Sequence, residues 1–168
     1  QLVVVRSLTK FYAIAGLRVG FALAHPDLLA RWQQWRDPWS VNGLASVGAI
    51  AALGDREFQQ RTYAWLPPSR QRLFAQLQAI GCDPLPGAAN FLLVRSPVSV
   101  AALQRELLQS DRILIRTCHS FARDGSFGEQ GDRWFRLAVR TPQENDSLIE
   151  ALTRAISRLQ QTGLSVAE

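Results

Sequence analysis

The stretch SLTKFYAIAGLRVG, residues 7–20, contains Lys10, the one lysine among the 19 basic residues of the chain. All the others are arginines. A guanidinium group stays protonated and is a poor nucleophile, whereas a primary amine can shift its pKa, attack a carbonyl and form an imine. Because all the remaining basic residues are arginines, the single lysine indicates amine chemistry at Lys10.

Hydroxyl and guanidinium groups surround this lysine. Ser7 and Thr9 offer neutral donors, and Arg18 can grip a phosphate through two parallel hydrogen bonds. A neighbouring cation also lowers the pKa of an amine, which favours its reactive neutral form. These groups suit an aldehyde cofactor that carries a phosphate, and pyridoxal 5'-phosphate is such a cofactor. The alternative is an ordinary solvated lysine in a loop, since the pattern Ser-x-x-Lys also occurs by chance.

The composition is that of a globular protein. The 168 residues are 47% hydrophobic and 20% charged. The net charge of +5 permits an acidic partner, but the arginines are scattered, so we expect no nucleic-acid binding. Cys82 and Cys118 have no metal-ligand spacing, so we expect no metal and two reduced thiols, as in the cytoplasm. No run reaches the roughly 20 apolar residues of a membrane span, and no signal peptide is seen.

The first part of the chain is expected to alternate short strands and helices. Leu2–Val5 and Leu17–Ala24 predict strands, and residues 26–35 predict a helix. Leu44–Leu53 is small and apolar nearly all round, which predicts a buried helix. Residues 55–80 predict a longer helical region in which Pro67 and Pro68 cause a kink or divide it into two helices, with Gly81 at its end.

The rest of the chain predicts a small sheet covered by helices on one side. Strands are expected at residues 90–95, 113–116 and 134–139, and Ser99 is expected to cap a helix between the first two. A polar loop is expected at residues 123–132. Thr141-Pro142-Gln143-Glu144 is the start signature of a helix that runs to about Gln160. The order strand, helix, strand, strand, helix predicts an α/β sandwich.

Residues 7–20 resemble the cofactor-lysine segment of the class I/II aminotransferases, the fold-type-I pyridoxal phosphate enzymes. The resemblance implies that Lys10 is the Schiff-base lysine and that Ser7, Thr9 and Arg18 hold the cofactor phosphate. Gly16 and Gly20 would allow close passage of the backbone. The implied fold is the C-terminal part of the fold-type-I fold. Residues 1–54 would be the end of the large domain, and residues 55–168 the small α/β domain.

Later segments resemble one branch of that family, which holds histidinol-phosphate aminotransferase and threonine-phosphate decarboxylase. The similar segments are residues 38–42, 90–94 and 134–145. By this resemblance Arg136 pairs with the α-carboxylate of the substrate. Residues 113–121 look more like the decarboxylase of cobalamin biosynthesis, which would make Arg116 a ligand of the substrate's own phosphate. The alternative for Arg116 is a surface arginine at a strand end.

Three other interpretations stay open. The chain can be a histidinol-phosphate or other class I/II aminotransferase, a folded remnant without turnover, or part of a DNA-bound regulator with an upstream helix-turn-helix. The family's N-terminal half, with its remaining cofactor contacts, has no counterpart in this sequence, and we expect a piece of a larger protein that is a homodimer when intact. The polar loop at residues 126–131 is longer than the family pattern predicts.

Overall fold

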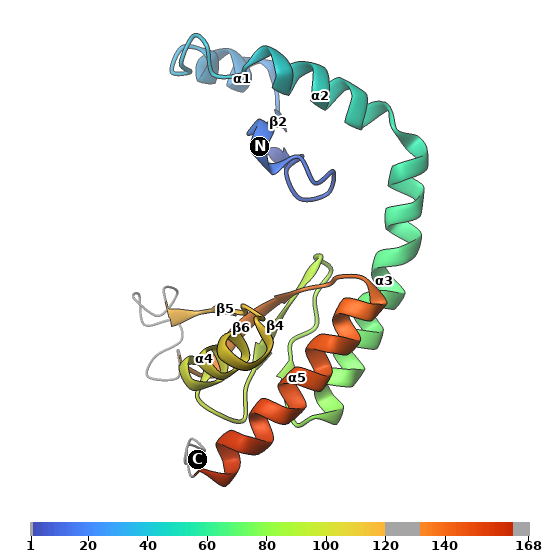
Figure 1. The fold of residues 1–168 in the computed structure, drawn as a ribbon. Helices are drawn as coiled ribbons and strands as arrows, with labels where there is room; N and C mark the ends of the chain where they lie inside the picture. The colour runs from blue at the N-terminus through green and yellow to red at the C-terminus, as the bar shows by residue number, and fades with distance from the viewer. Residues whose placement is uncertain (1, 120–131, 163–168) are drawn as a thin grey trace. The chain divides into compact units, whose positions relative to one another are not determined.

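A computed structural model describes residues 2–119 and 132–162 (Figure 1). The chain divides into two compact units, Gln1–Arg61 and Thr62–Glu168. The long helix α3 (Arg56–Ala79) begins in the first unit and ends in the second. The domain boundary predicted between residues 54 and 55 stays a prediction. Within the described ranges, no helix is long and apolar enough to cross a membrane.

The first unit opens with an antiparallel hairpin of β1 (Val4–Ser7) and β2 (Gly20–Leu23). β1 lies two residues further along the chain than predicted, because its last residue, Ser7, pairs with Gly20. β2 begins later than predicted, because residues 15–17 form the short 3-10 helix η1 and the following residue, Arg18, takes a left-handed conformation (φ 53°). The segment between the two strands carries Lys10.

Two capped helices follow the hairpin. In α1 (Pro26–Gln33) the backbone N–H of the second residue donates to the His25 imidazole, and in α2 (Gly43–Gly54) the N–H of Ala45 donates to the side chain of Asn42 at 2.8 Å. The prediction that the apolar residues 44–53 form a buried helix is wrong. Ala45 is the buried residue of this helix, whereas the apolar side chains at positions 44, 47 and 50 are 68–77% exposed. The first unit has a small core, centred on Leu8, Val19 and Ala45, which contacts only one face of α2.

Helix α3 runs without interruption through Pro67 and Pro68. Of the two predicted alternatives, the division into two helices is therefore wrong, and the kink stays a prediction. Proline has no N–H to donate, but its fixed φ is compatible with helical geometry. The second half of α3 buries Leu73 and Leu77 in the core of the second unit, and this packing favours a continuous helix across the two prolines.

The second unit contains a four-stranded antiparallel sheet in the order β3-β4-β6-β5. Its strands are β3 (Asp83–Pro84), β4 (Phe91–Arg95), β5 (Arg116–Thr117) and β6 (Trp134–Ala138). The strand predicted at 113–116 is wrong in extent, because only residues 116 and 117 pair with β6.

Helices α4 (Val100–Asp111) and α5 (Pro142–Gln161) pack against each other and, with the end of α3, cover one face of the sheet (Figure 1). Burial alternates along the central strands. Leu92, Val94, Phe135 and Leu137 join the helical side chains in one core. The alternate residues of both strands point to the other face, which we call the open face and which includes Phe91, Arg95, Arg136 and Ala138.

Candidate functional site

The turn that carries Lys10 follows β1 directly. The N–H of Tyr12 donates to the carbonyl oxygen of Leu8 at 3.2 Å, and the N–H of Ala13 donates to that of Lys10 at 3.3 Å. Leu8 is buried in the core of the first unit and fixes the start of the turn. The Lys10 side chain itself is exposed, so its amine is accessible to a reagent from solvent.

Beside this turn, Ser7, Thr9 and Arg18 line one pocket of about 390 Å³. The hydroxyl groups of Ser7 and Thr9 lie 2.8 Å apart, and Arg18 Nη1 donates to the carbonyl oxygen of Ala15 at 2.9 Å. Among the described residues, no carboxylate pairs with the Arg18 guanidinium. The structure thus brings three of the four predicted cofactor residues together, while Lys10 adjoins Thr9 in the chain and is not a lining residue of this pocket.

Gly20 forms part of the same pocket for a steric reason. A Cβ atom on Gly20 would lie 2.7 Å from the carbonyl oxygen of Arg6, closer than real Cβ contacts allow. The hairpin can therefore close beside Ser7 only with glycine at this position. At Gly16 an added Cβ would meet no atom within 4 Å, so the close passage expected there is not seen in the described part of the chain.

The residues of this pocket fit the phosphate of pyridoxal phosphate. Two hydroxyls and one guanidinium without a carboxylate partner match the needs of an oxyanion with several acceptor oxygens. The amine of the neighbouring residue, Lys10, is the group that an aldehyde requires. Ser7, Thr9 and Arg18 are thus the residues that could hold the phosphate, and Lys10 the residue that could bind the aldehyde carbon.

In the second unit, the sheet register pairs Arg116 directly with Arg136 on the open face. Side chains opposite each other in an antiparallel pair lie about 4.5–5.5 Å apart at Cβ, and like charges there are destabilising. Neither arginine forms an ion pair with a carboxylate of the described residues. The Arg136 guanidinium lies over the Phe91 ring, 4.8 Å from its centroid. The two predicted substrate residues are therefore paired across the strands, and no carboxylate of the described residues neutralises their charge.

Two neighbouring residues, Arg95 and Cys118, show how positive charge is distributed around Arg116 and Arg136. Arg95 lies on the same face but pairs with Asp83 at 3.4 Å, so its charge is compensated. Burial raises the pKa of the Cys118 thiol, while the charges of Arg136 and Arg116 act to lower it. Both arginines therefore act electrostatically on the same buried atom. Within residues 2–119 and 132–162, the open-face positive charge that lacks a carboxylate partner lies at these two residues.

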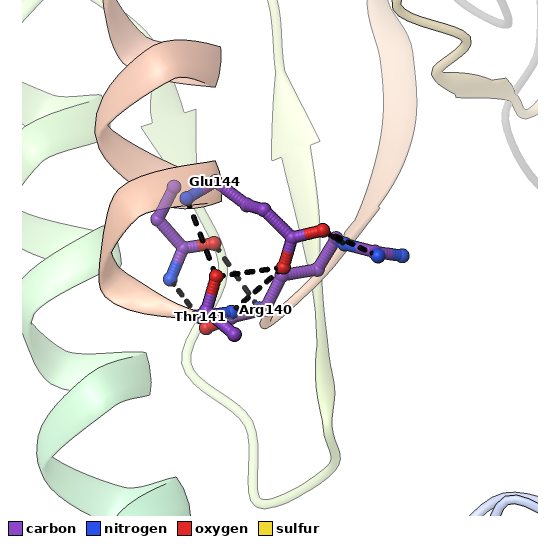
Figure 2. A network of polar contacts seen from close by, with 4 residues as sticks. Arg140, Thr141 and Glu144 are labelled. Atoms are coloured by element: carbon purple, nitrogen blue, oxygen red, sulfur yellow. Dashed lines mark hydrogen bonds and ion pairs between the residues drawn. The ribbon is translucent and has the colours of Figure 1, made fainter.

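The junction between β6 and α5 is held by a polar network (Figure 2). The Asn145 side chain accepts from the backbone N–H of Arg140 at 3.1 Å and donates to its carbonyl oxygen at 2.9 Å. The hydroxyl of Thr141 accepts from the N–H of Glu144, whose carboxylate accepts from the N–H of Thr141, which completes the predicted capping box. Glu144 also binds the guanidinium of Arg140. Hydrogen bonds from Arg140 and Thr141 lower the pKa of Glu144 to about 2.

A larger pocket of about 540 Å³ lies at the end of the sheet that this network holds. Arg136 and Arg140 line it together with Arg112 and the segment of residues 113–115, which does not pair with β6. Because Glu144 neutralises Arg140, the free cations of this pocket, among the described residues, are Arg112 and Arg136. The early end of the β5–β6 pairing thus leaves space beside Arg136.

Sequence reasoning missed two residues of this region, Phe91 and Asn145. Phe91 could not be found, because its contact with Arg136 depends on strand register. Asn145 had a signal, since it is a polar residue on the apolar stripe of α5 that continues with Leu148 and Leu152, and it is only 4% exposed. The polar loop at 126–131 and residues 120 and 121 lie outside the described residues.

A family model and a curated relative both match nearly the whole length of this chain. Residues 1–152 match the family model described as aminotransferase class I and II. The chain is 39% identical over 170 residues to threonine-phosphate decarboxylase of Salmonella typhimurium, which covers 98% of this chain and 43% of that protein.

Two solved structures have the same fold. Histidinol-phosphate aminotransferase from Clostridium acetobutylicum superposes with a TM-score of 0.82 at 28% identity and covers 94% of this chain and 46% of the other. The enzyme of the same name from Sinorhizobium meliloti was solved in complex with pyridoxal-5'-phosphate. It superposes with a TM-score of 0.79 at 26% identity, and the match covers 94% of this chain and 41% of the other. The predicted α/β fold class is confirmed, and the chain spans less than half the length of these relatives.

Proposed function

The chain belongs to the aminotransferase class I and II family, and from this premise we propose that it is the lysine-bearing part of an enzyme that acts on a phosphorylated amine substrate. The family uses pyridoxal phosphate. When bound, this cofactor supplies an aldehyde for a lysine and a ring that draws electrons from the substrate Cα. The proposal gives each predicted site residue of this chain a separate task.

The residues of the first unit hold the cofactor and move a proton. Ser7, Thr9 and Arg18 would hold the phosphate of the cofactor beside Lys10. Lys10 would supply the amine that the aldehyde requires, and its Nζ would carry a proton to or from the substrate. Its exposed position at the end of β1 supports this task.

Our choice of substrate rests on the cross-strand pairing of Arg116 with Arg136. Two arginines at directly paired strand positions, without a described carboxylate partner, suit a substrate with two oxyanions. Threonine phosphate has a carboxylate for Arg136 and a phosphate for Arg116, whereas histidinol phosphate has a phosphate and no carboxylate. We therefore favour a threonine-phosphate decarboxylase, in agreement with the Salmonella relative. The alternatives are a histidinol-phosphate or other class I/II aminotransferase, and a folded remnant without turnover.

The first test uses the single lysine. The chain is treated with pyridoxal phosphate or with pyridoxal, reduced with borohydride, and the adducts on Lys10 and on the N-terminal amine are measured by mass spectrometry. We expect pyridoxal phosphate to be preferred at Lys10 by about tenfold or more, as charge-assisted hydrogen bonds to the phosphate imply. Arg18→Gln should abolish the preference, and Arg31→Gln, an exposed arginine of α1, should retain it. Equal preference at Lys10 and at the N-terminal amine would contradict the cofactor proposal.

A second test addresses the substrate. Arginine side-chain NMR signals of the chain are followed during titration with O-phosphothreonine and with histidinol phosphate. We expect O-phosphothreonine to shift the Nε signals of both Arg116 and Arg136 while leaving the exposed Arg105 of α4 unchanged. Shifts of both signals with histidinol phosphate but not with O-phosphothreonine would favour the aminotransferase. For the intact enzyme we expect a cytoplasmic homodimer.

A further inference from the structure

A hydrogen-bonded bridge joins the Lys10 turn to the junction of α2 and α3. The side-chain amide of Gln59 donates one hydrogen bond to Tyr12 Oη at 3.1 Å and another to the carbonyl oxygen of Leu53 at 3.0 Å. Tyr12 follows Lys10 by two residues, and Leu53 lies in the last turn of α2. A side-chain amide has two N–H groups, so both donors of Gln59 are used. This one side chain connects three segments of the first unit.

Three aromatic rings strengthen the same contact. Phe58 stacks on Tyr12, with ring centroids 5.9 Å apart and an angle of 26° between the planes. It also meets Phe11 edge to face at 6.1 Å, and Phe11 contacts Tyr12 in the same manner at 4.8 Å. Such ring pairs add to the stability given by area burial alone. Phe58 and Gln59 of α3 thus hold the two residues that follow Lys10.

The start of α3 is fixed, whereas the Lys10 turn needs support. Asp55 Oδ1 accepts from the N–H of Phe58 at 2.9 Å, and its carbonyl oxygen accepts from the N–H of Gln59 at 3.2 Å, which caps the helix. The turn ends at Ala13, whose φ of 56° is left-handed. A non-glycine residue in this conformation costs free energy and persists only where the surrounding structure holds it.

We propose that Gln59 is a positioning residue for Lys10, because its two hydrogen bonds hold in place the turn that carries Lys10 beside the pocket of Ser7, Thr9 and Arg18. This inference rests on the proposed role of Lys10 as the cofactor-bearing lysine. Among the described residues, the Lys10 side chain forms no hydrogen bond or ion pair of its own. The backbone of the turn therefore sets the point from which the Lys10 side chain extends.

Gln59→Met tests the proposal with little change of shape, because both side chains are unbranched. The thioether has no donor, so both hydrogen bonds are lost. Gln60→Met is the matched control, since Gln60 is exposed and the same substitution enters the same helical turn. The measured quantity is the preference for pyridoxal phosphate over pyridoxal at Lys10, relative to the N-terminal amine. We expect Gln59→Met to lower it about threefold to tenfold, as the loss of one or two hydrogen bonds implies, and Gln60→Met to leave it unchanged.

A second variant tests whether Gln59 acts on Lys10 through Tyr12. Tyr12→Phe removes the acceptor hydroxyl and keeps the ring. If the two side chains act through one hydrogen bond, the double variant Tyr12→Phe/Gln59→Met will show a preference no lower than that of Gln59→Met alone. Two independent effects would multiply instead. Far-ultraviolet circular dichroism of every variant checks that the helices remain.

The outcomes of the proposal and of its premise are distinct. A wild-type chain without preference at Lys10 refutes the cofactor role itself, before any Gln59 variant is compared. A wild-type preference that Gln59→Met and Gln60→Met change equally overturns the positioning role and leaves the cofactor role intact. Multiplying effects in the double variant also overturn it, because Gln59 would then not act through Tyr12 on the Lys10 turn.

Discussion

Replacing Asn145 with alanine tests how the β6–α5 junction is held. Asn145 is 4% exposed, and its side chain satisfies both the N–H and the carbonyl group of Arg140. The variant loses two hydrogen bonds of about 1 kcal/mol each and leaves two backbone groups without these partners, for which a further 1–3 kcal/mol applies when they stay shielded from water. Part of the Arg140 backbone can reach solvent, so we expect a total loss of about 2–4 kcal/mol.

The loss is measured by amide hydrogen exchange. The exchange of the N–H groups that pair β4 with β6, such as those of Leu92 and Phe135, reports the opening of the second unit without interference from the first. A loss of 2 kcal/mol or more raises their exchange rate about 30-fold or more, since 1.4 kcal/mol is a factor of ten. Gln143→Ala, at an exposed position of the same helical turn, is the control. An Asn145→Ala variant that exchanges like this control would refute the reasoning.

Three other outcomes follow from the structure. The pKa of Glu144 is lowered to about 2, from about 4.3 in an unfolded chain. Its contribution to the stability of the fold is therefore present above pH 4.3 and is lost as the pH falls toward 2. When unfolding of the Glu144→Gln variant is followed during acid titration, this loss of stability should be absent. Leu44→Glu on the exposed face of α2 should reduce binding of a hydrophobic dye, whereas Ala45→Glu, at a fully buried site, should unfold the first unit. Burial raises the pKa of Cys82 to about 12 and also raises that of Cys118, so neither thiol should react with a thiol reagent at pH 8 until the chain unfolds.

The features that could be predicted are those that neighbouring residues determine. The capping box from Thr141 to Glu144 and the cap at Ser99 were predicted and are present, because donor and acceptor are three residues apart in the sequence. Gly81, predicted to end the long helical region, has the left-handed φ of 79° that glycine tolerates. The contact of Ser7 with Thr9 is similarly local.

The features that could not be predicted depend on distant parts of the chain. Strand β5 is short because residues 113–115 leave β6, which no local pattern encodes. The apolar composition of α2 predicts burial, but burial also requires a partner surface, and the core of the first unit reaches only one face. The direct pairing of Arg116 with Arg136 is set by the register between strands, and the bridge from Gln59 to Tyr12 spans 47 residues of sequence.

A single lysine in an exposed turn gives the chain one cleavage site for a lysine-specific protease. Exposed turns are preferred sites of proteolytic nicking, and the cut after Lys10 would separate β1 from the rest of the first unit. A modified lysine side chain is not recognised by such a protease. The fraction of chain that survives digestion therefore measures directly how many molecules carry a covalently occupied Lys10, without an activity assay.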